Sequence, residues 1–419
     1  MSATPERTDV LVVGAGVAGL ACARDLAAAG RSVLVVEASD DVGGRMRSDR
    51  LDGFVVDRGF QVFNTSYPQV KRRLNLRDLR LRPFTPGVLT HTDHGRLRLT
   101  DPSRDARSLT DLLRGRLAAP RDLLALGTLS ARDMLGPTVL LRRAEDRTTR
   151  TALASAGFSE EFVERFFRPF LSGIFLEDQL ETSSRFFHMV WRSMLRGTLC
   201  LPADGIGAVP AALVTALPAG SVLLDTPVAL LTDDGVQTAH GDRLAARAVV
   251  VATGKGPASA LLPGLDVPAG RVVTTYYHVA PRPPLAEPTL LTDARLRFLN
   301  TCVLSEVAPT YAPAGHALIA TSVLGEDNPQ ARKTVTSALE EVYETDTAGW
   351  DLLTARTVRD ALPAMPPPQP LSRTSRVAPG RYVCGDHRAT GSVQGALASG
   401  ARAAREVLED LTGRRHRRR

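Results

Sequence analysis

The first part of the chain alternates between strand-like and helix-like patterns of apolar residues. Asp9 to Val13 and Ser32 to Val36 are short runs rich in β-branched residues, whereas Val17 to Ala29 is rich in alanine and leucine. β-branched residues favour strands, and alanine and leucine favour helices. The pattern therefore predicts a strand, a helix and a second strand at the start of the chain.

Later segments switch between a helical region and strand-rich regions. From about Thr100 to Leu199 the apolar residues follow helical spacing, with many arginines and little strand signal. Beyond this region we expect strands within 221–254 and 271–324, a helix at 329–343, a strand at 381–384 and a helix at 391–411. Strand-forming segments are thus spread over the whole chain, which favours domains that are discontinuous in sequence.

A glycine-rich turn connects the first predicted strand to the first predicted helix. It reads Gly14-Ala15-Gly16-Val17-Ala18-Gly19. In a dinucleotide-binding turn the first glycine permits the tight turn, the second lets the pyrophosphate approach the backbone, and the third lets the helix pack on the strand. The helix N-terminus also offers amide groups and a positive dipole end to phosphates. The turn therefore predicts a dinucleotide site.

An acidic residue ends the second predicted strand. Glu37 lies 18 residues beyond Gly19, and Ala38 follows it. A carboxylate in this place can accept hydrogen bonds from the ribose hydroxyls of an adenosine, and it repels the 2′-phosphate of NADP. The strand, turn, helix, strand and acid together favour a bound dinucleotide over an ordinary turn.

The next segment resembles a known superfamily. It reads Asp41-Val42-Gly43-Gly44-Arg45-Met46-Arg47-Ser48. The glycine pair and the arginine are similar to the second motif of flavin-dependent amine oxidases, phytoene desaturases and protoporphyrinogen oxidase. The resemblance implies that Gly43 and Gly44 continue the phosphate site and that Arg45 neutralises and positions FAD. Adjacent glycines allow close backbone approach, and a guanidinium offers paired donors to phosphate oxygens.

The C-terminal part resembles the flavin-closing motif of the same superfamily. Gly385-Asp386 is followed by the glycine-rich segment from Gly391 to Gly400. The resemblance implies that Asp386 binds the ribitol chain or a nearby phosphate. It also implies that the backbone of Ser392 and Val393 faces the flavin pyrimidine, where the helix dipole stabilises negative charge on the reduced ring. The alternative from the residues alone is that Asp386 is only a helix cap.

Three weaker landmarks occur in the order that the superfamily shows. Val250 to Gly254 is similar to the strand and turn on the adenine side, Gly53 to Phe63 to the segment that passes the flavin ring, and Leu201 to Gly207 to a turn that starts a helix of the FAD domain. In the second segment a glycine allows backbone approach and a glutamine is a polar neighbour of the ring. We therefore add to the predicted cofactor site Gly59, Phe60, Gln61, Ala252 and Thr253.

The resemblance implies an α/β fold, in which a Rossmann-like FAD-binding domain carries a discontinuous α+β substrate domain. A chain of 419 residues is long enough for two such cores. We assign residues 1–80, 200–256 and 370–412 to the FAD-binding domain. Residues 81–199, a helical insert, and 257–369, which include a sheet, form the predicted substrate domain, and 413–419 form a basic tail.

Several departures from the amine oxidases shape the predicted chemistry. The chain has no lysine in a matching motif, and Ser392-Val393-Gln394 is not aromatic where those enzymes frame the flavin. The segment from Arg373 to Arg381 has no cysteine, so we expect non-covalent FAD. These departures favour an oxidase, dehydrogenase or desaturase that transfers hydride from a bulky, largely apolar substrate to flavin N5. Such chemistry needs no dedicated acid or base when the substrate is held against the ring.

The sequence predicts no catalytic residue and leaves several alternatives open. Candidate substrate contacts are Phe175, Tyr276 and Tyr277. The electron acceptor is not indicated. A redox-neutral flavoprotein isomerase, an amine oxidase and a catalytically silent FAD-binding interaction protein remain the alternatives.

Charge and composition restrict the partners. The net charge is +7, and the arginines between 414 and 419 supply five of these charges. A terminal run of this kind does not form a basic face, so we expect no nucleic-acid binding. A contact of the tail with an anionic membrane surface stays open. The four cysteines do not have the spacing of a metal site, and the polar N-terminus has no secretory pattern. We therefore predict no metal and a cytoplasmic location.

Overall fold

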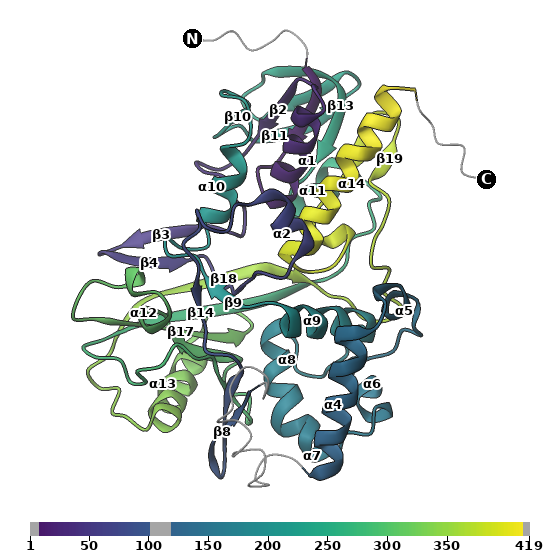
Figure 1. Cartoon of the computed structure of the whole chain (residues 1–419). Coiled ribbons are helices and arrows are strands. Elements are labelled where there is room, and N and C mark those ends of the chain that lie inside the picture. Colours follow the sequence, from purple (N-terminus) through teal and green to yellow (C-terminus); the bar gives the residue numbers. More distant parts are fainter. Residues whose placement is uncertain (1–7, 101–118, 414–419) are drawn as a thin grey trace.

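Two β-sheets organise the chain, and each is assembled from segments that lie far apart in sequence. The computed structural model describes residues 8–100 and 119–413. In Figure 1 the first sheet and its helices form the upper part, while the second sheet and a helical lobe lie below it. The start of the predicted helical region, residues 101–118, and most of the predicted basic tail lie outside the described residues.

The first sheet contains the predicted βαβ unit. Its strands are β1 (Thr8–Val13), β2 (Val33–Val36), β10 (Val222–Leu223), β11 (Val228–Thr232), β12 (Gly235–Thr238), β13 (Arg243–Val251), β19 (Arg376–Ala378) and β20 (Arg381–Val383). β10, β2, β1, β13 and β20 are adjacent and parallel, in that order. Helices cover both faces of such parallel sheets, so their strands are apolar throughout.

One face of this sheet is covered by the helices α1 (Val17–Ala28), α2 (Pro68–Arg73), α10 (Ala208–Val214) and α14 (Val393–Leu411). α1 and α14 approach each other closely because Gly400 has no side chain: a Cβ there would lie 2.1 Å from the carbonyl oxygen of Ala18. On the other face Leu11, Val13 and Val249 pack beneath β11 and β12 and near α11 (Lys255–Leu261). This is the predicted Rossmann-like α/β arrangement.

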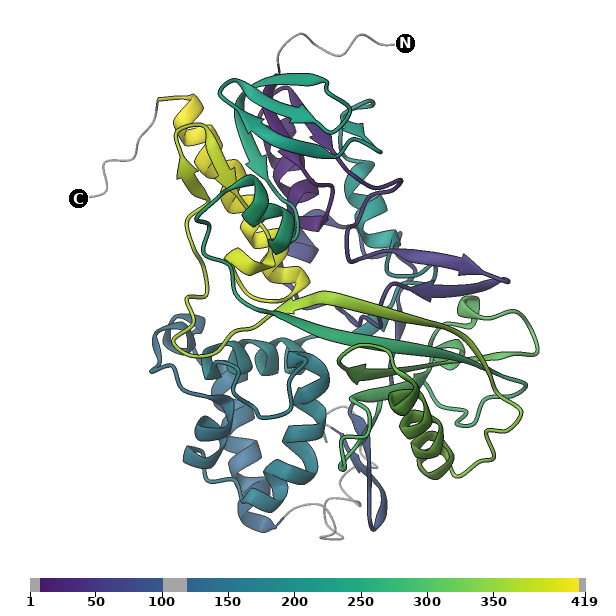
Figure 2. The same cartoon turned by 180° about the vertical axis from the view of Figure 1, so that it is seen from behind.

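The second sheet has the strand order β18, β14, β17, β16, β15, β7, β8. The bounds are β7 (Val88–Thr92), β8 (Gly95–Leu99), β14 (Gly270–Ala280), β15 (Leu291–Asp293), β16 (Asn300–Val303), β17 (Ala317–Leu324) and β18 (Asp351–Pro363). The long strands β14 and β18 cross beneath the first sheet (Figure 2). α13 (Pro329–Tyr343) covers one face of this second sheet.

Short elements join the second sheet to the first. The opposite face of the second sheet packs on β4, β9, α12 and η2. Their bounds, with those of the strands that pair with them, are β3 (Ser48–Leu51), β4 (Phe54–Asp57), β5 (Phe63–Asn64), β6 (Arg82–Pro83), β9 (Leu199–Leu201), α12 (Leu304–Val307) and η2 (Pro309–Tyr311). β3 and β4 form a hairpin, and the segment after β4 leads to the predicted flavin-passing residues.

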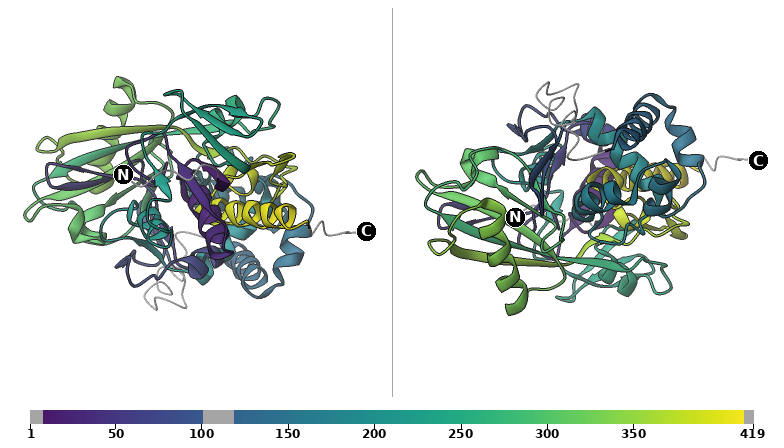
Figure 3. Two further views of the ribbon diagram at one scale, coloured as in Figure 1. Left: turned by 90° about the horizontal axis from the view of Figure 1, so that it is seen from above. Right: turned by 90° about the horizontal axis from the view of Figure 1, so that it is seen from below.

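A helical lobe packs on the β7–β8 end of the second sheet and lies away from α13 (Figure 3). It contains α4 (Pro120–Leu135), α5 (Thr138–Arg143), α6 (Thr149–Ser155), α7 (Glu160–Phe162), a π-helical turn η1 (Val163–Phe167), α8 (Arg168–Phe175) and α9 (Ser184–Arg196). Its core is aromatic: Phe162, Phe167, Phe187 and Trp191 are among the buried side chains. This confirms the helical character predicted for the described part of this region.

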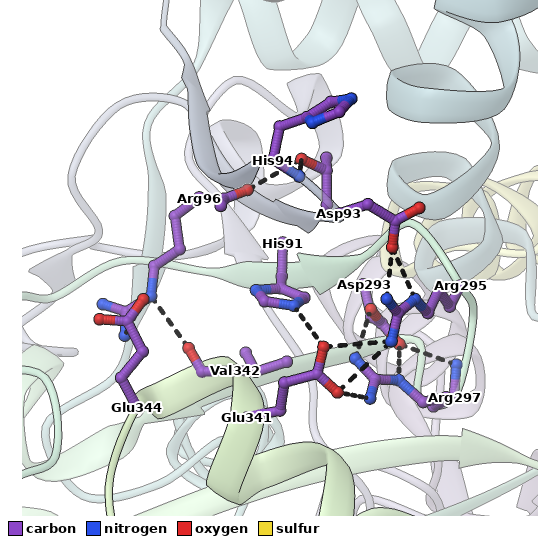
Figure 4. A network of polar contacts seen from close by, with 12 residues as sticks. His91, Asp93, His94, Arg96, Asp293, Arg295, Arg297, Glu341, Val342 and Glu344 are labelled. Atoms are coloured by element: carbon purple, nitrogen blue, oxygen red, sulfur yellow. Dashed lines mark hydrogen bonds and ion pairs between the residues drawn. The ribbon is translucent and has the colours of Figure 1, made fainter.

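A polar network ties the β7–β8 hairpin and the end of β15 to α13 (Figure 4). Asp293 is fully buried and accepts hydrogen bonds from the backbone N of Arg297 at 3.1 Å and from its Nε at 2.7 Å. Arg297 also bonds Glu341 on α13, whose carboxylate lies 3.1 Å from His91 Nε2. A buried carboxylate needs such partners, and Arg297 connects Asp293 to Glu341 on α13.

Among the residues that the structure describes, no helix is both long enough and apolar enough to cross a bilayer.

Candidate cofactor site

The three glycines of the first turn have three different roles in the structure. Gly14 has φ +105°, which a side chain would strain, and its N donates to the Val36 carbonyl at 2.7 Å. A Cβ on Gly19 would lie 2.1 Å from the Gly14 oxygen, so this glycine lets α1 pack on β1. A Cβ on Gly16 would meet no atom within 4 Å. Gly16 therefore leaves open space at the N-terminus of α1, where a phosphate group fits.

The second glycine motif lies beside this open space. Gly43 and Gly44 have φ +111° and +59°, and Gly43 N donates to the Ala15 carbonyl at 2.9 Å. A Cβ on Gly44 would lie 3.6 Å from the Cα of Gly16. The first helix has no side-chain cap at Gly16. Two predicted phosphate-binding segments are thus brought together around amide groups that suit an anion.

Glu37 holds the first turn in place. Its Oε2 accepts a hydrogen bond from the backbone N of Ala15 at 2.6 Å, and its Oε1 accepts from the backbone N and the hydroxyl of Ser39 at 3.1 and 2.9 Å. Glu37 as a whole is only 9% exposed, whereas Ala38 beside it is exposed. Sequence reasoning assigned this carboxylate to the ribose and missed its bond to the turn. The ribose contact stays a prediction.

Replacing Glu37 by alanine should weaken FAD binding by about 1.5 to 3 kcal/mol, which is the worth of charge-assisted hydrogen bonds. The Ala15 amide would lose its acceptor and the ribose its carboxylate. Titration of the apoprotein with FAD measures the change. Asp41→Ala is the matched control, because this exposed carboxylate bonds only the next backbone N in the structure. Equal affinity of Glu37→Ala and wild type would contradict the assignment.

Arg45 and Asp386 form an ion pair that joins the second motif to the C-terminal motif. Arg45 Nη2 lies 2.7 Å from Asp386 Oδ1, and Nη1 donates to the Ala361 carbonyl at 2.7 Å. Burial acts to lower the pKa of Arg45, but the charge of Asp386 and its hydrogen bond outweigh burial and raise that pKa. The arginine cation can donate hydrogen bonds to phosphate oxygens, and the aspartate anion can accept hydrogen bonds from hydroxyl groups.

The closing motif begins at a glycine whose backbone conformation would be strained in any residue that has a side chain. Gly385 has φ +150°, and its N donates to the Ser399 hydroxyl at 3.1 Å. The 3₁₀ turn η3 (Asp386–Arg388) follows it. Ser392 then caps α14 by accepting from Gly395 N at 3.0 Å, and Val393 starts the helix. The helix N-terminus is therefore formed by the two residues predicted to face the flavin.

His387 belongs to this site, although sequence reasoning missed it. The ring packs on Gly385, where a Cβ would lie 2.5 Å from His387 Cε1, and the residue is 5% exposed. Burial lowers the pKa of His387 to about 4, so the imidazole is neutral at ordinary pH. A lone histidine after an aspartate carries no signal of burial in the sequence. Only the fold shows that it adds no charge beside Arg45 and Asp386.

The predicted flavin-passing segment contacts both domains. Gly59 has φ +90°, and a Cβ there would lie 3.2 Å from Val358 on β18. Phe60 N donates to the Thr275 hydroxyl at 3.2 Å, and Gln61 Nε2 donates to the Arg45 carbonyl at 2.7 Å. Gln61 therefore lies next to the second motif.

The predicted adenine-side turn lies beside the first glycine. Ala252 N donates to the Val13 carbonyl at 2.7 Å, and a Cβ on Gly14 would lie 3.0 Å from the Ala252 oxygen. Thr253 follows in the same turn.

A buried carboxyl group joins the two domains just before Gly59. Asp57 is 2% exposed, and it accepts hydrogen bonds from the Ser48 hydroxyl at 2.5 Å, from Ile206 N at 2.9 Å and from the Tyr311 hydroxyl at 3.0 Å. These partners come from β3, from the turn before α10 and from η2. Sequence reasoning gave Asp57 no role. The acid sits beside Phe54-Val55-Val56, and a charge in such an apolar run signals a buried, paired group.

The three predicted substrate contacts are buried at three different places. Phe175 is 2% exposed and packs against Phe186 in the helical lobe. Tyr276 lies on the α13 face of the second sheet and donates to Asp327 at 2.9 Å. Tyr277 lies on the opposite face and donates to the Asp57 carbonyl at 2.8 Å. The structure does not bring the three together, and substrate contact stays a prediction for each.

The residues described fit FAD. Open space above Gly16, the adjoining glycine pair, the N-termini of two helices and the Arg45–Asp386 pair lie along the carboxyl ends of β1, β2 and β20. Ligands of open α/β sheets bind at this edge. In the described part of the chain, no cluster of three or more His, Cys, Asp or Glu side chains could hold a metal ion.

Comparison with solved structures shows the same fold in two oxidoreductases. A protein from Exiguobacterium sp. 255-15, assigned as a protoporphyrinogen oxidase, has a TM-score of 0.71 at 18% identity, over 97% of this chain and 99% of that one. Cyclohexylamine oxidase from Brevibacterium oxydans IH-35A has a TM-score of 0.70 at 20% identity, with the same coverage.

Curated relatives match over shorter segments. Putrescine oxidase of Kocuria rosea is 55% identical over 60 residues, which is 14% of this chain and 13% of that enzyme. L-amino-acid oxidase of Mus musculus is 26% identical over 285 residues, 62% of this chain and 43% of that enzyme. The matched segments therefore span less than half of each relative.

A sequence model of one family matches almost the whole chain. Its description is flavin containing amine oxidoreductase, and it covers residues 17–408. This range includes the glycine pair, Arg45 and the closing motif. It confirms the predicted superfamily, the FAD cofactor and the oxidoreductase class. The chain belongs to the flavin-containing amine oxidoreductase family.

Proposed function

We propose that the protein is an FAD-dependent oxidoreductase that removes hydride from a bulky, largely apolar substrate. When bound, the flavin would supply the hydride acceptor, and the chain would hold and orient the substrate against it. The observation that carries the proposal is a contact between the aromatic core of the helical lobe and the closing motif.

Met365 makes this contact. Its side chain is 2% exposed and belongs to the aromatic core of the lobe. Gly391 N donates to its sulfur at 3.2 Å, and its carbonyl accepts from Ser183 N at 2.8 Å. Gly391 precedes Ser392, so apolar surface of the lobe borders the end of the motif that is predicted to face the flavin. Thioether and aromatic groups suit an apolar ring or polyene.

The positions of the lysines support the same substrate class. The chain has Lys71 on α2, Lys255 on α11 and Lys333 on α13, and Lys255 pairs with Asp360 at 3.1 Å. None of them lies on a strand of the second sheet. The lysine that amine oxidases of the resembled superfamily place near the flavin from such a strand therefore has no counterpart.

Amine oxidation is the second candidate. The family description and two of the enzymes compared above, putrescine oxidase and cyclohexylamine oxidase, favour it. An amine substrate binds as a cation, which needs a carboxylate partner when it is buried. Asp386 in the closing motif and Asp57 just before Gly59 are buried carboxylates of the predicted site, and both already have partners.

Anaerobic reduction of the flavin distinguishes the two candidates. We expect its visible absorption band to bleach with polyene, porphyrinogen or polycyclic compounds and to persist with simple primary amines. Dithionite reduction of each sample is the control for a competent flavin. Rapid bleaching by a primary amine, with no bleaching by the apolar compounds, would contradict the proposal and support amine oxidation.

A further inference from the structure

The outward faces of α4 and α5 carry an unusual concentration of apolar side chains. The exposed fractions are 70% for Leu124, 38% for Met134, 77% for Leu135, 52% for Val139 and 62% for Leu140. The other large apolar side chains exposed among the described residues lie on four separate strands or, for Leu224, just after β10. We call these five residues, together with Arg121, Arg132, Arg142 and Arg143, the α4–α5 surface. Concentrated apolar exposure of this kind marks an interaction site.

The carboxylates of α4 point the opposite way, into the lobe. Asp122 is 1% exposed and accepts from Ser159 N at 2.6 Å and from its hydroxyl at 2.8 Å. Asp133 is fully buried, with its Oδ2 2.7 Å from His188 Nδ1. A helix that faces water normally buries leucines and exposes carboxylates. α4 does the reverse at these positions, so its outer face is suited to an apolar environment.

The charges that remain on this face are all positive. Within residues 119–144 the exposed charged side chains are Arg121, Arg132, Arg142 and Arg143, of which Arg132 is paired with Asp133 at 3.2 Å, and the only acids in that range are the buried Asp122 and Asp133. The exposed Glu145 that follows this range is paired with Arg147. Leucines flanked by arginines, without exposed carboxylates, match an interface with anionic lipid. The long arginine side chains can reach phosphate groups while the leucines enter the acyl boundary.

The α4–α5 surface is held rigidly by α9 behind it. Arg192 Nη1 donates to the Gly136 carbonyl at 2.8 Å, Trp191 Nε1 donates to the Ser130 hydroxyl at 3.1 Å, and Arg185 Nε donates to the Ala144 carbonyl at 2.7 Å. α4 and α5 lie on the outer side of the lobe, away from the second sheet (Figure 1). The exposed leucines therefore belong to an anchored face and not to a loose segment.

We propose that the α4–α5 surface docks the protein on an anionic lipid bilayer, as a peripheral contact. The sequence suggested the arginine tail for such a contact, whereas this proposal concerns a different surface, within residues 119–144. The proposal stands independently of the substrate class proposed above. If both proposals hold, the helical lobe that borders the closing motif lies next to the lipid bilayer, in which an apolar substrate dissolves.

Co-sedimentation of the full FAD-loaded chain with vesicles tests the proposal. We expect binding to phosphatidylcholine vesicles that contain phosphatidylglycerol, and weaker binding to phosphatidylcholine alone. Leu124→Gln/Leu135→Gln/Leu140→Gln should weaken binding to both by about tenfold or more, because each buried leucine contributes strongly. Arg142→Gln/Arg143→Gln should lose about tenfold on the anionic vesicles alone. Leu230→Gln, at an exposed leucine of β11 (46%), is the matched control.

Several results would overturn the proposal. These are absence of vesicle binding by the wild type, unchanged binding of the triple variant, and complete loss of binding when residues 414–419 are removed. A wild type that is dimeric without lipid, with a monomeric triple variant, would assign the surface to a second copy of this chain. Visible flavin and an unchanged melting temperature identify folded variants, and if the triple variant fails this check, the arginine variant decides.

Discussion

Asp57→Ala is expected to destabilise the protein by about 2 to 4 kcal/mol at neutral pH, because three buried donors lose their acceptor. Those donors are the Ser48 hydroxyl, the backbone N of Ile206 and the Tyr311 hydroxyl. Removal of a buried charge offsets part of this cost, but it does not replace three hydrogen bonds. The loss should loosen the junction between β4, the turn before α10 and the second sheet.

Asp57→Asn should behave differently, since its amide oxygen can still accept from Ser48 and Ile206 while its NH₂ group donates to the Tyr311 oxygen. It keeps the hydrogen bonds and removes the charge. We therefore expect this variant to be as stable as the wild type at neutral pH, or more stable. Equal destabilisation by alanine and asparagine would contradict the network described here.

Asp57 should also make the stability of the protein depend on pH. Burial raises the pKa of Asp57 from its ordinary 3.8 to about 6, although the bonds from Ser48, Ile206 and Tyr311 act to lower it. The folded state therefore binds the proton more tightly than the unfolded state. This stability contribution is fully present below the unfolded pKa and is lost as the pH rises through about 6.

Urea unfolding at a series of pH values measures the effect. The free energy of unfolding of Asp57→Asn minus that of the wild type should grow by about 2 to 3 kcal/mol between the two pKa values and stay constant above them. Asp52→Asn is the control, because Asp52 is exposed on the same hairpin and has φ +49°, which asparagine tolerates. A difference that is flat with pH would show that Asp57 titrates normally.

Much of the fold could be predicted because local signals agreed with it. The glycine turn lies between β1 and α1 as predicted, and the helix at Pro329–Tyr343 has the predicted bounds. The long strand β18 (Asp351–Pro363) was not predicted. It is an edge strand with several exposed polar residues, such as Arg359 and Asp360, so apolar alternation is weak there. Its pairing with β14 decides its conformation.

The site was predicted as separate motifs, and its internal contacts were not. Arg45 and Asp386 were each assigned to FAD, but they are 341 residues apart, so only the fold shows that they pair at 2.7 Å. The same holds for the bond from Glu37 to Ala15, because the sequence does not report which donor a carboxylate meets. Motif spacing predicts which chemical groups are present, and tertiary packing decides which of them already have hydrogen-bond partners within the protein.

Gly16→Ala and Gly19→Ala should both lose flavin, but for different reasons that stability measurements separate. Gly16 has φ −67° and ψ 167°, which alanine adopts freely, and a Cβ there would meet no atom within 4 Å. We expect the apoprotein of this variant to keep wild-type stability within about 0.5 kcal/mol. The added methyl group would occupy the space above the turn and weaken FAD binding by about tenfold to hundredfold, as charge-assisted bonds to the pyrophosphate lengthen.

Gly19→Ala should destabilise the apoprotein itself. Its Cβ would lie 2.1 Å from the Gly14 oxygen and 3.0 Å from the Ala252 Cβ, and a backbone carbonyl cannot turn aside as a flexible side chain can. Overpacking of this kind costs about 1 to 3 kcal/mol or more. Guanidinium unfolding of the apoproteins and FAD titration separate the two variants, with Gly256→Ala on α11 as a control at an open position. If Gly16→Ala bound FAD as tightly as the wild type, the pyrophosphate would not lie above Gly16, and the cofactor site proposed here would be misplaced.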